Sequence, residues 1–158
     1  MPNLMSFHKP FLTLDDLPDS VGLDNWTIFP YVNPTFILGV GELTRSDYYY
    51  LQSYLKFETS TINNEVHWTY FFHKGVYDLT IIHATNTYSG ILTIKIDDVV
   101  LGTPDFYSDP TVYAVKTIFS DIILSKGNHT LKIKIEDRHA SSTSYNMRLG
   151  TFTFRRTS

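Results

Sequence analysis

Apolar and polar residues alternate with a period of two along much of the chain beyond residue 46. This period indicates β-strands that bury one face and expose the other. In EVHWTYFF the apolar set is Val66, Trp68, Tyr70 and Phe72. In GILTIKI the apolar set is Leu92, Ile94 and Ile96, with Thr93 and Lys95 between its members.

Turn signals divide these patterns into strands. Asp97-Asp98 predicts a bend between two strands, and Gly75 and Gly127 each predict a turn. In the last strand Met147 and Leu149 occupy odd positions whereas Phe152 and Phe154 occupy even ones, so Gly150 between them predicts a β-bulge. DYYYLQSYLKFET is expected to form one long aromatic strand, and TVYAVKTIFSDIIL a strand or a pair of strands.

The pattern predicts seven to nine antiparallel strands with short turns and no helix longer than about two turns. We therefore expect an all-β fold, an antiparallel two-sheet β-sandwich of jelly-roll type, over residues 41–158.

Residues 1–40 have a different character. Five of the seven prolines lie before residue 36, and proline lacks the N–H group that a central strand needs. The same stretch is rich in large apolar groups, which indicates an extended arm that packs either on its own sandwich or on a neighbouring molecule. The predicted interface residues are Phe7, Phe11, Trp26 and Phe29 of the arm, and Tyr48, Tyr49 and Tyr50, which would form a seam between copies.

Composition narrows the possible partners. The chain has 158 residues, enough for one domain, with 42% hydrophobic and 18% charged residues. Thirteen basic against sixteen acidic residues give a net charge of −3, which argues against a nucleic-acid partner. The absence of cysteine excludes disulfides and thiolate metal sites. No apolar run is long enough to cross a bilayer, and the N-terminus lacks the features of a signal peptide, so no membrane partner is expected.

Two segments resemble a module of bacteriophage structural proteins, GVYDLTIIHATNTYSGILTIKIDDVVLGTPDFYS and SKGNHTLKIKIEDRHASSTSYNMRL. The match covers about residues 65 to 155. Asp98 departs from the pattern, which more often has glycine there. The residues that carry the resemblance are Gly75, Tyr77, Leu79, Thr85, Asn86, Thr87, Gly90, Ile96, Asp97, Gly102, Thr103, Asp105, Tyr107, Ser108, Gly127, His129, Thr130, Leu131, Ala140, Ser141, Ser142 and Tyr145.

The resemblance implies a non-catalytic virion component, either a fibre head or a capsid-decorating protein, commonly a trimer. Because no heptad shaft or β-helical repeat precedes the sandwich, we expect a decoration or cement protein. Its partner would then be the major capsid protein or another virion protein, and its location the virion.

The same segments are also similar to galactose-binding-like sandwiches of carbohydrate-binding modules. Such modules stack a sugar ring on a loop aromatic residue and hold it with a nearby amide or carboxylate, so a host-surface glycan is the alternative partner. For the tyrosines, packing at the rim or at an oligomer interface remains open. The candidate glycan-binding residues are Asn86, Tyr88, Asp105, Tyr107, Tyr113 and Asn146.

The sequence gives little support for an enzyme. None of the six histidines has the spacing of a metal motif, and His83 lies on the predicted core face, where a hydrogen-bonded buried imidazole is expected. Asp97 and Asp98 point to opposite faces if they lie in a strand, so they do not form a catalytic pair. Asp105 and Asp109 could contribute to a Ca²⁺ site, but no metal or cofactor is expected.

Overall fold

The computed structural model describes residues 25–28, 30, 34, 36–38, 42–48 and 52–158, and every regular element in this part of the chain is a β-strand. The strands are β1 (Asn25–Ile28), β2 (Phe36–Leu38), β3 (Glu42–Tyr48), β4 (Gln52–Glu58), β5 (Glu65–Phe72), β6 (Gly75–Thr85), β7 (Gly90–Ile96), β8 (Val99–Gly102), β9 (Val112–Leu124), β10 (Gly127–Arg138) and β11 (Met147–Arg156). No helix able to span a membrane is found among these residues.

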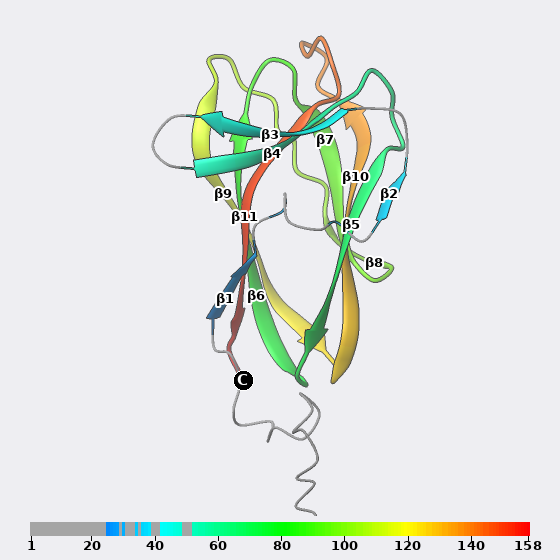
Figure 1. The fold of residues 1–158 in the computed structure, drawn as a ribbon, viewed down its shortest axis with the longest axis vertical. Coiled ribbons are helices and arrows are strands. Elements are labelled where there is room, and N and C mark those ends of the chain that lie inside the picture. Colours follow the sequence, from blue (N-terminus) through cyan, green and yellow to red (C-terminus); the bar gives the residue numbers. More distant parts are fainter. Residues whose placement is uncertain (1–24, 29, 31–33, 35, 39–41, 49–51) are drawn as a thin grey trace, which may run out of the picture.

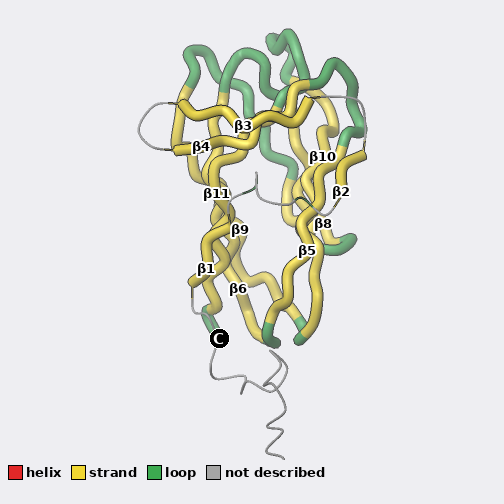
Figure 2. The backbone as a smooth tube through the Cα atoms, in the orientation of Figure 1, coloured by secondary structure: helices red, strands yellow, loops and turns green. Residues whose placement is uncertain are grey.

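The strands form two antiparallel sheets that face each other (Figure 1). Sheet A has the order β3-β4-β11-β6-β9, and β1 also pairs with β11. Sheet B has the order β2-β5-β10-β7-β8. The tube drawing shows loops gathered at the end of the sandwich where β3 and β4 cross (Figure 2). The expected all-β two-sheet sandwich is confirmed.

The core lies between the sheets and follows the period of two predicted from the sequence. Val66, Trp68 and Phe72 of β5 are buried, as are Leu92, Ile94 and Ile96 of β7. The Trp68 ring meets Phe152 of the opposite sheet edge to face, with 5.0 Å between ring centroids. Its Nε1–H donates to the carbonyl of Pro30 over 2.8 Å, which satisfies the one polar atom of the ring.

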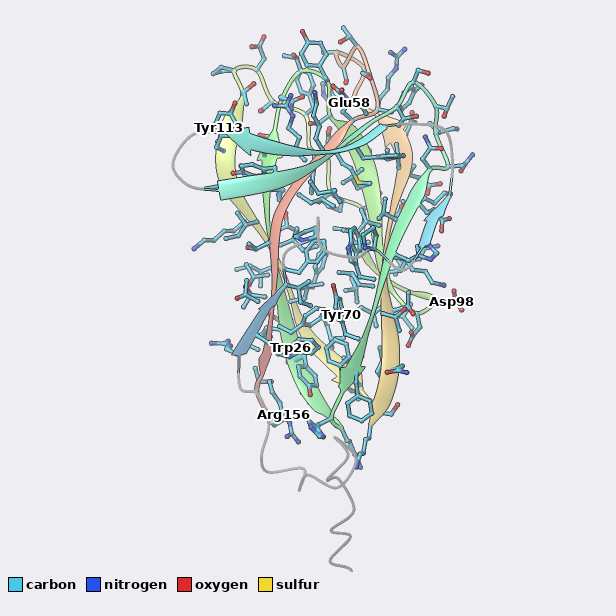
Figure 3. All side chains as sticks on the ribbon, viewed as in Figure 1. Trp26, Glu58, Tyr70, Asp98, Tyr113 and Arg156 are labelled. Carbon is cyan, nitrogen blue, oxygen red and sulfur yellow. The ribbon has the colours of Figure 1, made fainter. Side chains whose placement is uncertain are left out.

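The predicted arm and the sandwich overlap. β1 and β2 lie within residues 1–40, and they pair with β11 and β5. Trp26 packs against Phe72 and Phe154, with ring centroids 4.8 and 5.6 Å away. Trp26 therefore packs inside the sandwich of its own chain, which explains why the sequence has a large apolar residue at this position. Figure 3 shows Trp26 and Tyr70 close together between the sheets, and their centroids are 5.7 Å apart. Phe7, Phe11, Phe29, Tyr49 and Tyr50 lie outside the described residues.

Two predictions about the strands are wrong. DYYYLQSYLKFET is not one strand, because β3 ends at Tyr48 and pairs in antiparallel fashion with β4, with Tyr48 opposite Gln52. Aromatic residues favour strands on both sides of a turn equally, so composition did not reveal the reversal. The structure also describes eleven strands, not seven to nine, because the short strands β1 and β2 carry little periodic signal and because the pair β3 and β4 replaces one predicted strand.

The predicted bulge at Gly150 is confirmed. The register between β11 and β6 shifts between Leu149 and Thr151, and this shift lets Met147, Leu149, Phe152 and Phe154 all point into the core. A Cβ atom added to Gly150 would lie 3.0 Å from the carbonyl oxygen of Ile82 and 3.2 Å from the Tyr54 ring. The bulge therefore requires glycine for space.

We expect Gly150→Val to lower the free energy of unfolding by about 1–3 kcal/mol, because the added methyl groups must push β6 and Tyr54 aside. Urea unfolding followed by tryptophan fluorescence measures this change. Thr151→Val is the matched control: it keeps the volume of a half-exposed neighbour and should change stability by less than about 0.5 kcal/mol. Equal effects of the two substitutions would contradict the steric argument.

Candidate functional site

Four loops meet at one end of the sandwich, and we call this region the loop end. It consists of residues 59–64, 86–89, 103–111 and 139–146, which connect β4 to β5, β6 to β7, β8 to β9 and β10 to β11. Figure 1 shows these connections side by side above the sheets. Each loop joins a strand of one sheet to a strand of the other, so the packed sheets hold the ends of all four loops in fixed positions.

Backbone hydrogen bonds link these loops to one another. The N–H of Asn86 donates to the carbonyl of Phe106 over 3.2 Å, and the N–H of Thr143 donates to the carbonyl of Thr87 over 3.2 Å. The Thr85 and Ser108 hydroxyls are 2.6 Å apart. The loop end is therefore one connected polar structure, a rigid base for a binding site.

Two of the predicted glycan-binding residues are used up in building this structure. Asn146 is 7% exposed, and its Oδ1 accepts from the N–H of Thr59 (3.1 Å) and the hydroxyl of Ser144 (3.2 Å). Asn86 is 1% exposed, and its Oδ1 accepts from the N–H of Tyr88 over 2.8 Å. Asn146 joins two loops and Asn86 closes a turn within its own loop, and both side chains lie below the surface, where a sugar cannot reach them.

Three other predicted residues remain accessible at the loop end. Tyr88 is 52% exposed, Asp105 is exposed, and Tyr107 is half-buried. Oδ1 of Asp105 accepts from the N–H of Tyr107 over 2.9 Å, so this carboxylate fixes the backbone that carries the tyrosine. The second carboxylate oxygen of Asp105 has no hydrogen bond to a described residue.

His139 completes an aromatic platform with Tyr107. The two rings stack almost in parallel, with centroids 4.2 Å apart and an interplanar angle of 13°. His139 Nδ1 accepts from the N–H of Ser141 over 3.1 Å, so in the neutral ring Nε2 carries the hydrogen and can donate to a ligand. A sequence pattern could not indicate this pair, because the two residues come from different loops 32 positions apart.

Tyr113 is separate from the platform. It lies at the start of β9, is 38% exposed, and packs against Tyr54 of β4 with 6.2 Å between the ring centroids. Figure 3 places it at the outer margin of sheet A. Its contacts are those of a residue packed on the sheet.

His83 lies beneath the platform in the core. It is 2% exposed, its ring stacks on Phe106 with centroids 3.6 Å apart, and its Nε2 lies 2.9 Å from the hydroxyl of Thr117. The predicted hydrogen-bonded buried imidazole is confirmed. Burial lowers the pKa of His83 from 6.5 to about 4, because the apolar surroundings disfavour the charged ring.

A second polar cluster lies at the far end of the sandwich. Its members, Asp97, His129 and Ser125, follow one another in the order Asp, His, Ser of a catalytic triad. Nδ1 of His129 is 2.8 Å from Oδ2 of Asp97, and its Nε2 is 3.4 Å from the hydroxyl of Ser125. These residues line a groove of about 570 Å³ between β8 and β9. However, His129 Nε2 is closer to the backbone carbonyl of Ser125, at 2.9 Å. A nitrogen that donates to a carbonyl cannot accept the proton of a serine, so the cluster does not have the geometry of a nucleophilic site.

This cluster instead joins two turns. Asp97 has a positive φ of 53° in the β7–β8 bend, and its Oδ1 accepts from the N–H of Thr130 over 2.9 Å. Burial raises the pKa of Asp97, but the hydrogen bonds from the His129 ring and the Thr130 N–H outweigh this effect and bring the pKa below its ordinary value. Turn formation explains Asp97, as the sequence indicated.

Acidic and imidazole side chains do not gather in large groups among the described residues. Among them, no group of three or more His, Asp or Glu side chains is arranged to hold an ion. Asp105 supports the backbone of Tyr107, as described above, and Asp109 follows it in the same exposed loop.

No protein-family model matches the sequence, and no curated protein matches it. Several solved structures match the fold. A Paenibacillus xanthan lyase aligns with a TM-score of 0.63 and 18% identity over 75% of this chain, which spans 12% of the lyase. A family 6 carbohydrate-binding module from Clostridium cellulolyticum in complex with xylose aligns with a TM-score of 0.56 and 14% identity, covering 83% of this chain and 97% of the module.

A carbohydrate-binding module CBM36 in complex with calcium and xylotriose gives a TM-score of 0.54 and 12% identity, covering 82% of this chain and 98% of the module. This chain has the β-sandwich fold of these modules. Similarity to a carbohydrate-binding sandwich is therefore confirmed for the fold. None of the structures named here is a virion protein, and the capsid-decoration interpretation stays a prediction.

The low pKa of His83 generates a prediction about stability. The folded protein holds this ring neutral down to about pH 4, whereas the unfolded chain protonates it near pH 6.5. Its contribution to stability is therefore complete above pH 6.5 and is lost as the pH falls toward 4, a decrease of roughly 3 kcal/mol.

Urea unfolding at pH 4, 5, 6 and 7 measures this effect. His83→Gln removes the titrating ring, so the difference in unfolding free energy between wild type and variant should grow as the pH rises from 4 to 7. A constant difference over this range would show that His83 is not held neutral in the fold.

Proposed function

We propose that this protein is a non-catalytic carbohydrate-binding module whose ligand site is the loop end. The observation that carries the proposal is the stack of Tyr107 on His139. A stacked pair of partly exposed rings offers flat outer faces, and flat aromatic faces suit the apolar C–H face of a sugar ring.

Polar groups around the stack can orient a sugar. Nε2–H of His139 supplies a hydrogen-bond donor, and the second carboxylate oxygen of Asp105 supplies an acceptor. Tyr88 adds an exposed phenol at the neighbouring loop. An apolar surface beside a donor and an acceptor is the arrangement that hydroxyl-rich ligands require.

The fold supports the same proposal. The neighbouring structures include modules whose reported complexes contain xylose and xylotriose. We extend their ligand class, a glycan, to this chain on the strength of the platform. The proposed site works through the aromatic contacts and hydrogen bonds described above.

The arrangement of ionisable groups supports binding without catalysis. At the loop end, Asp105 is exposed and already holds the backbone of Tyr107. The buried titratable group nearby, His83, is enclosed by Phe106 and Thr117 and does not reach the surface. Asp105 and His139, the two ionisable groups offered to the sugar, each hold a backbone N–H of their own loop, which suits them to orienting a ligand.

A glycan array followed by calorimetry with the best ligand tests this function. We expect Tyr107→Ala to weaken binding at least tenfold, about 1.4 kcal/mol, because it removes half of the stack. Tyr107→Phe keeps the ring and should bind within about threefold of wild type. An array without any binding glycan would overturn the proposal.

Tyr113→Ala is the matched control, since it removes a tyrosine of comparable exposure that packs on Tyr54 instead of His139. It should leave glycan affinity unchanged. If Tyr113→Ala weakens binding as strongly as Tyr107→Ala, the site does not lie at the platform.

A further inference from the structure

Strand β9 forms a free edge of sheet A. It is the last strand of the order β3-β4-β11-β6-β9, and no described strand pairs with its other side. Figure 1 shows it at the margin of the sandwich. A free edge presents unpaired N–H and C=O groups that can pair with another chain. At 13 residues β9 is also the longest described strand.

The outward side of this edge carries apolar residues in contact with water. Ile118 is 59% exposed and Ile123 is 83% exposed. Tyr113, at the start of the strand, is 38% exposed. Exposed isoleucines on a free edge are a combination that proteins usually avoid, so this edge has the character of an interface.

Pairing with β6 gives each residue of β9 a position along the edge. Lys116 lies opposite Ile82 and Ile118 opposite Thr80, two positions apart. Leu79 pairs with Phe119 and Tyr77 with Ile122, so Asp78 faces a bulge of two residues. The bulge residues are Ser120 and Asp121, and Asp121 has a positive φ of 59°.

When each residue of β9 is given the position of the β6 residue opposite it, the residues before Ile118 complement those after it. Lys116 lies two positions before Ile118, and the bulge with Asp121 lies two positions after it. A second bulge, formed by Tyr113 and Ala114 opposite Ala84, lies four positions before Ile118, and Ile123 lies four positions after Ile118. We propose that two copies of the chain pair through β9 in antiparallel fashion, with a two-fold axis at Ile118.

The proposed pairing matches each outer side chain to a suitable partner. Residues directly opposite each other in an antiparallel ladder lie on the same face. Lys116 then meets Asp121 of the second copy, Ile118 meets its own equivalent, and Tyr113 meets Ile123 of the second copy. A two-fold axis repeats the first and third contacts, as expected of an isologous interface.

The two charges lack partners among the residues that the structure describes. Neither Lys116 nor Asp121 forms a side-chain hydrogen bond or ion pair with a described residue. Most other charged residues on the sheets are paired, such as Lys132 with Asp98 at 2.8 Å. Two unpaired charges of opposite sign, placed symmetrically about Ile118, complement each other across the axis.

Neighbouring registers do not give this complementarity. An axis at Thr117 places Lys116 against Ile118 and the Tyr113 bulge against the Asp121 bulge. An axis at Phe119 places Ile118 against the Asp121 bulge and Lys116 against Ile123. Both alternatives oppose charged and apolar groups, so the side chains select the axis at Ile118.

The bulges limit the paired segment. Ala114 and Asp121 both have positive φ, 57° and 59°, and bulges at these points bend the strand away from a flat edge. About an axis at Ile118, pairing free of bulges therefore extends only over residues 117–119 of each copy, a short interface. We expect a dimer that forms at micromolar to millimolar protein concentration, as small interfaces do.

Cysteine substitution tests the axis directly, because the chain contains no cysteine. At the axis the two Cα atoms of residue 118 would lie about 4.5–5.5 Å apart, within the range of a disulfide. Ile118→Cys should therefore form a disulfide dimer on mild oxidation. Ile123→Cys alone should stay monomeric, whereas a mixture of Ile123→Cys and Tyr113→Cys chains should cross-link.

Val99→Cys is the matched control, since Val99 is 68% exposed but belongs to β8 of sheet B. It should not cross-link at the rate of Ile118→Cys. Equal cross-linking of Ile118→Cys, Ile123→Cys and Val99→Cys would show random collision and overturn the proposal.

Sedimentation equilibrium of the unmodified chain gives an independent readout. Lys116→Asp and Ile118→Asp should each weaken dimerisation at least tenfold, and the exchange Lys116→Asp with Asp121→Lys should restore it. Thermal unfolding verifies that each variant is folded. A wild-type chain that sediments as a monomer up to about 1 mM, or an Ile118→Asp variant that dimerises like wild type, would refute the pairing.

The pairing has a consequence that rests on the proposed function. Antiparallel strands run in opposite directions, so the loop ends of the two copies would point away from each other. Such a dimer would join two glycan chains. The disulfide and sedimentation tests do not involve glycan, so the dimer and the glycan site succeed or fail separately.

Discussion

The apolar contact between the two sheets determines the rest of this structure. Strands β5, β6, β10 and β11 bury alternate residues along much of their length, and the buried sets of β5, β7 and β10 meet those of β6 and β11. Trp68 and Phe152 mark this contact, since they come from opposite sheets and pack ring to ring. Because the inner faces are fixed in this way, connections that join the sheets must pass over the ends, and this places four loops together.

At the loop end, buried polar residues build the support and exposed residues are left for binding. The amide oxygen of Asn146 accepts from a backbone N–H of a neighbouring loop, that of Asn86 accepts from a backbone N–H of its own loop, and both side chains are buried. The Asp105 carboxylate accepts from the N–H of Tyr107, and the His139 ring stacks on the Tyr107 ring. A rigid support of this kind lowers the entropy lost on binding, which suits a shallow site that gains little from each contact.

The open edge of sheet A follows from the same topology. The paired strands β3 and β4 form one margin of the sheet, and β9 has no described neighbour at the other. Its two bulges and its exposed isoleucines are therefore features of an edge and not of a central strand. The loop end and this edge are separate surfaces, so one can serve a ligand while the other serves a second copy.

The sequence by itself determined which residues face the core, because the period of two is a local property of a strand. It also located the bend at Asp97, the positive φ at Gly127 and the bulge at Gly150, since each depends on one residue and its immediate neighbours. It placed His83 in the core for the same reason.

Only the tertiary structure decided which of the candidate binding residues are available. The sequence makes Asn86, Tyr88 and Asn146 equal candidates for glycan binding. In the fold, both amides are buried and the tyrosine is exposed. The stack of Tyr107 on His139 and the self-complementary edge of β9 likewise depend on strand order and register. A local pattern specifies the face of each strand but not its neighbour, and the neighbour is what creates a site.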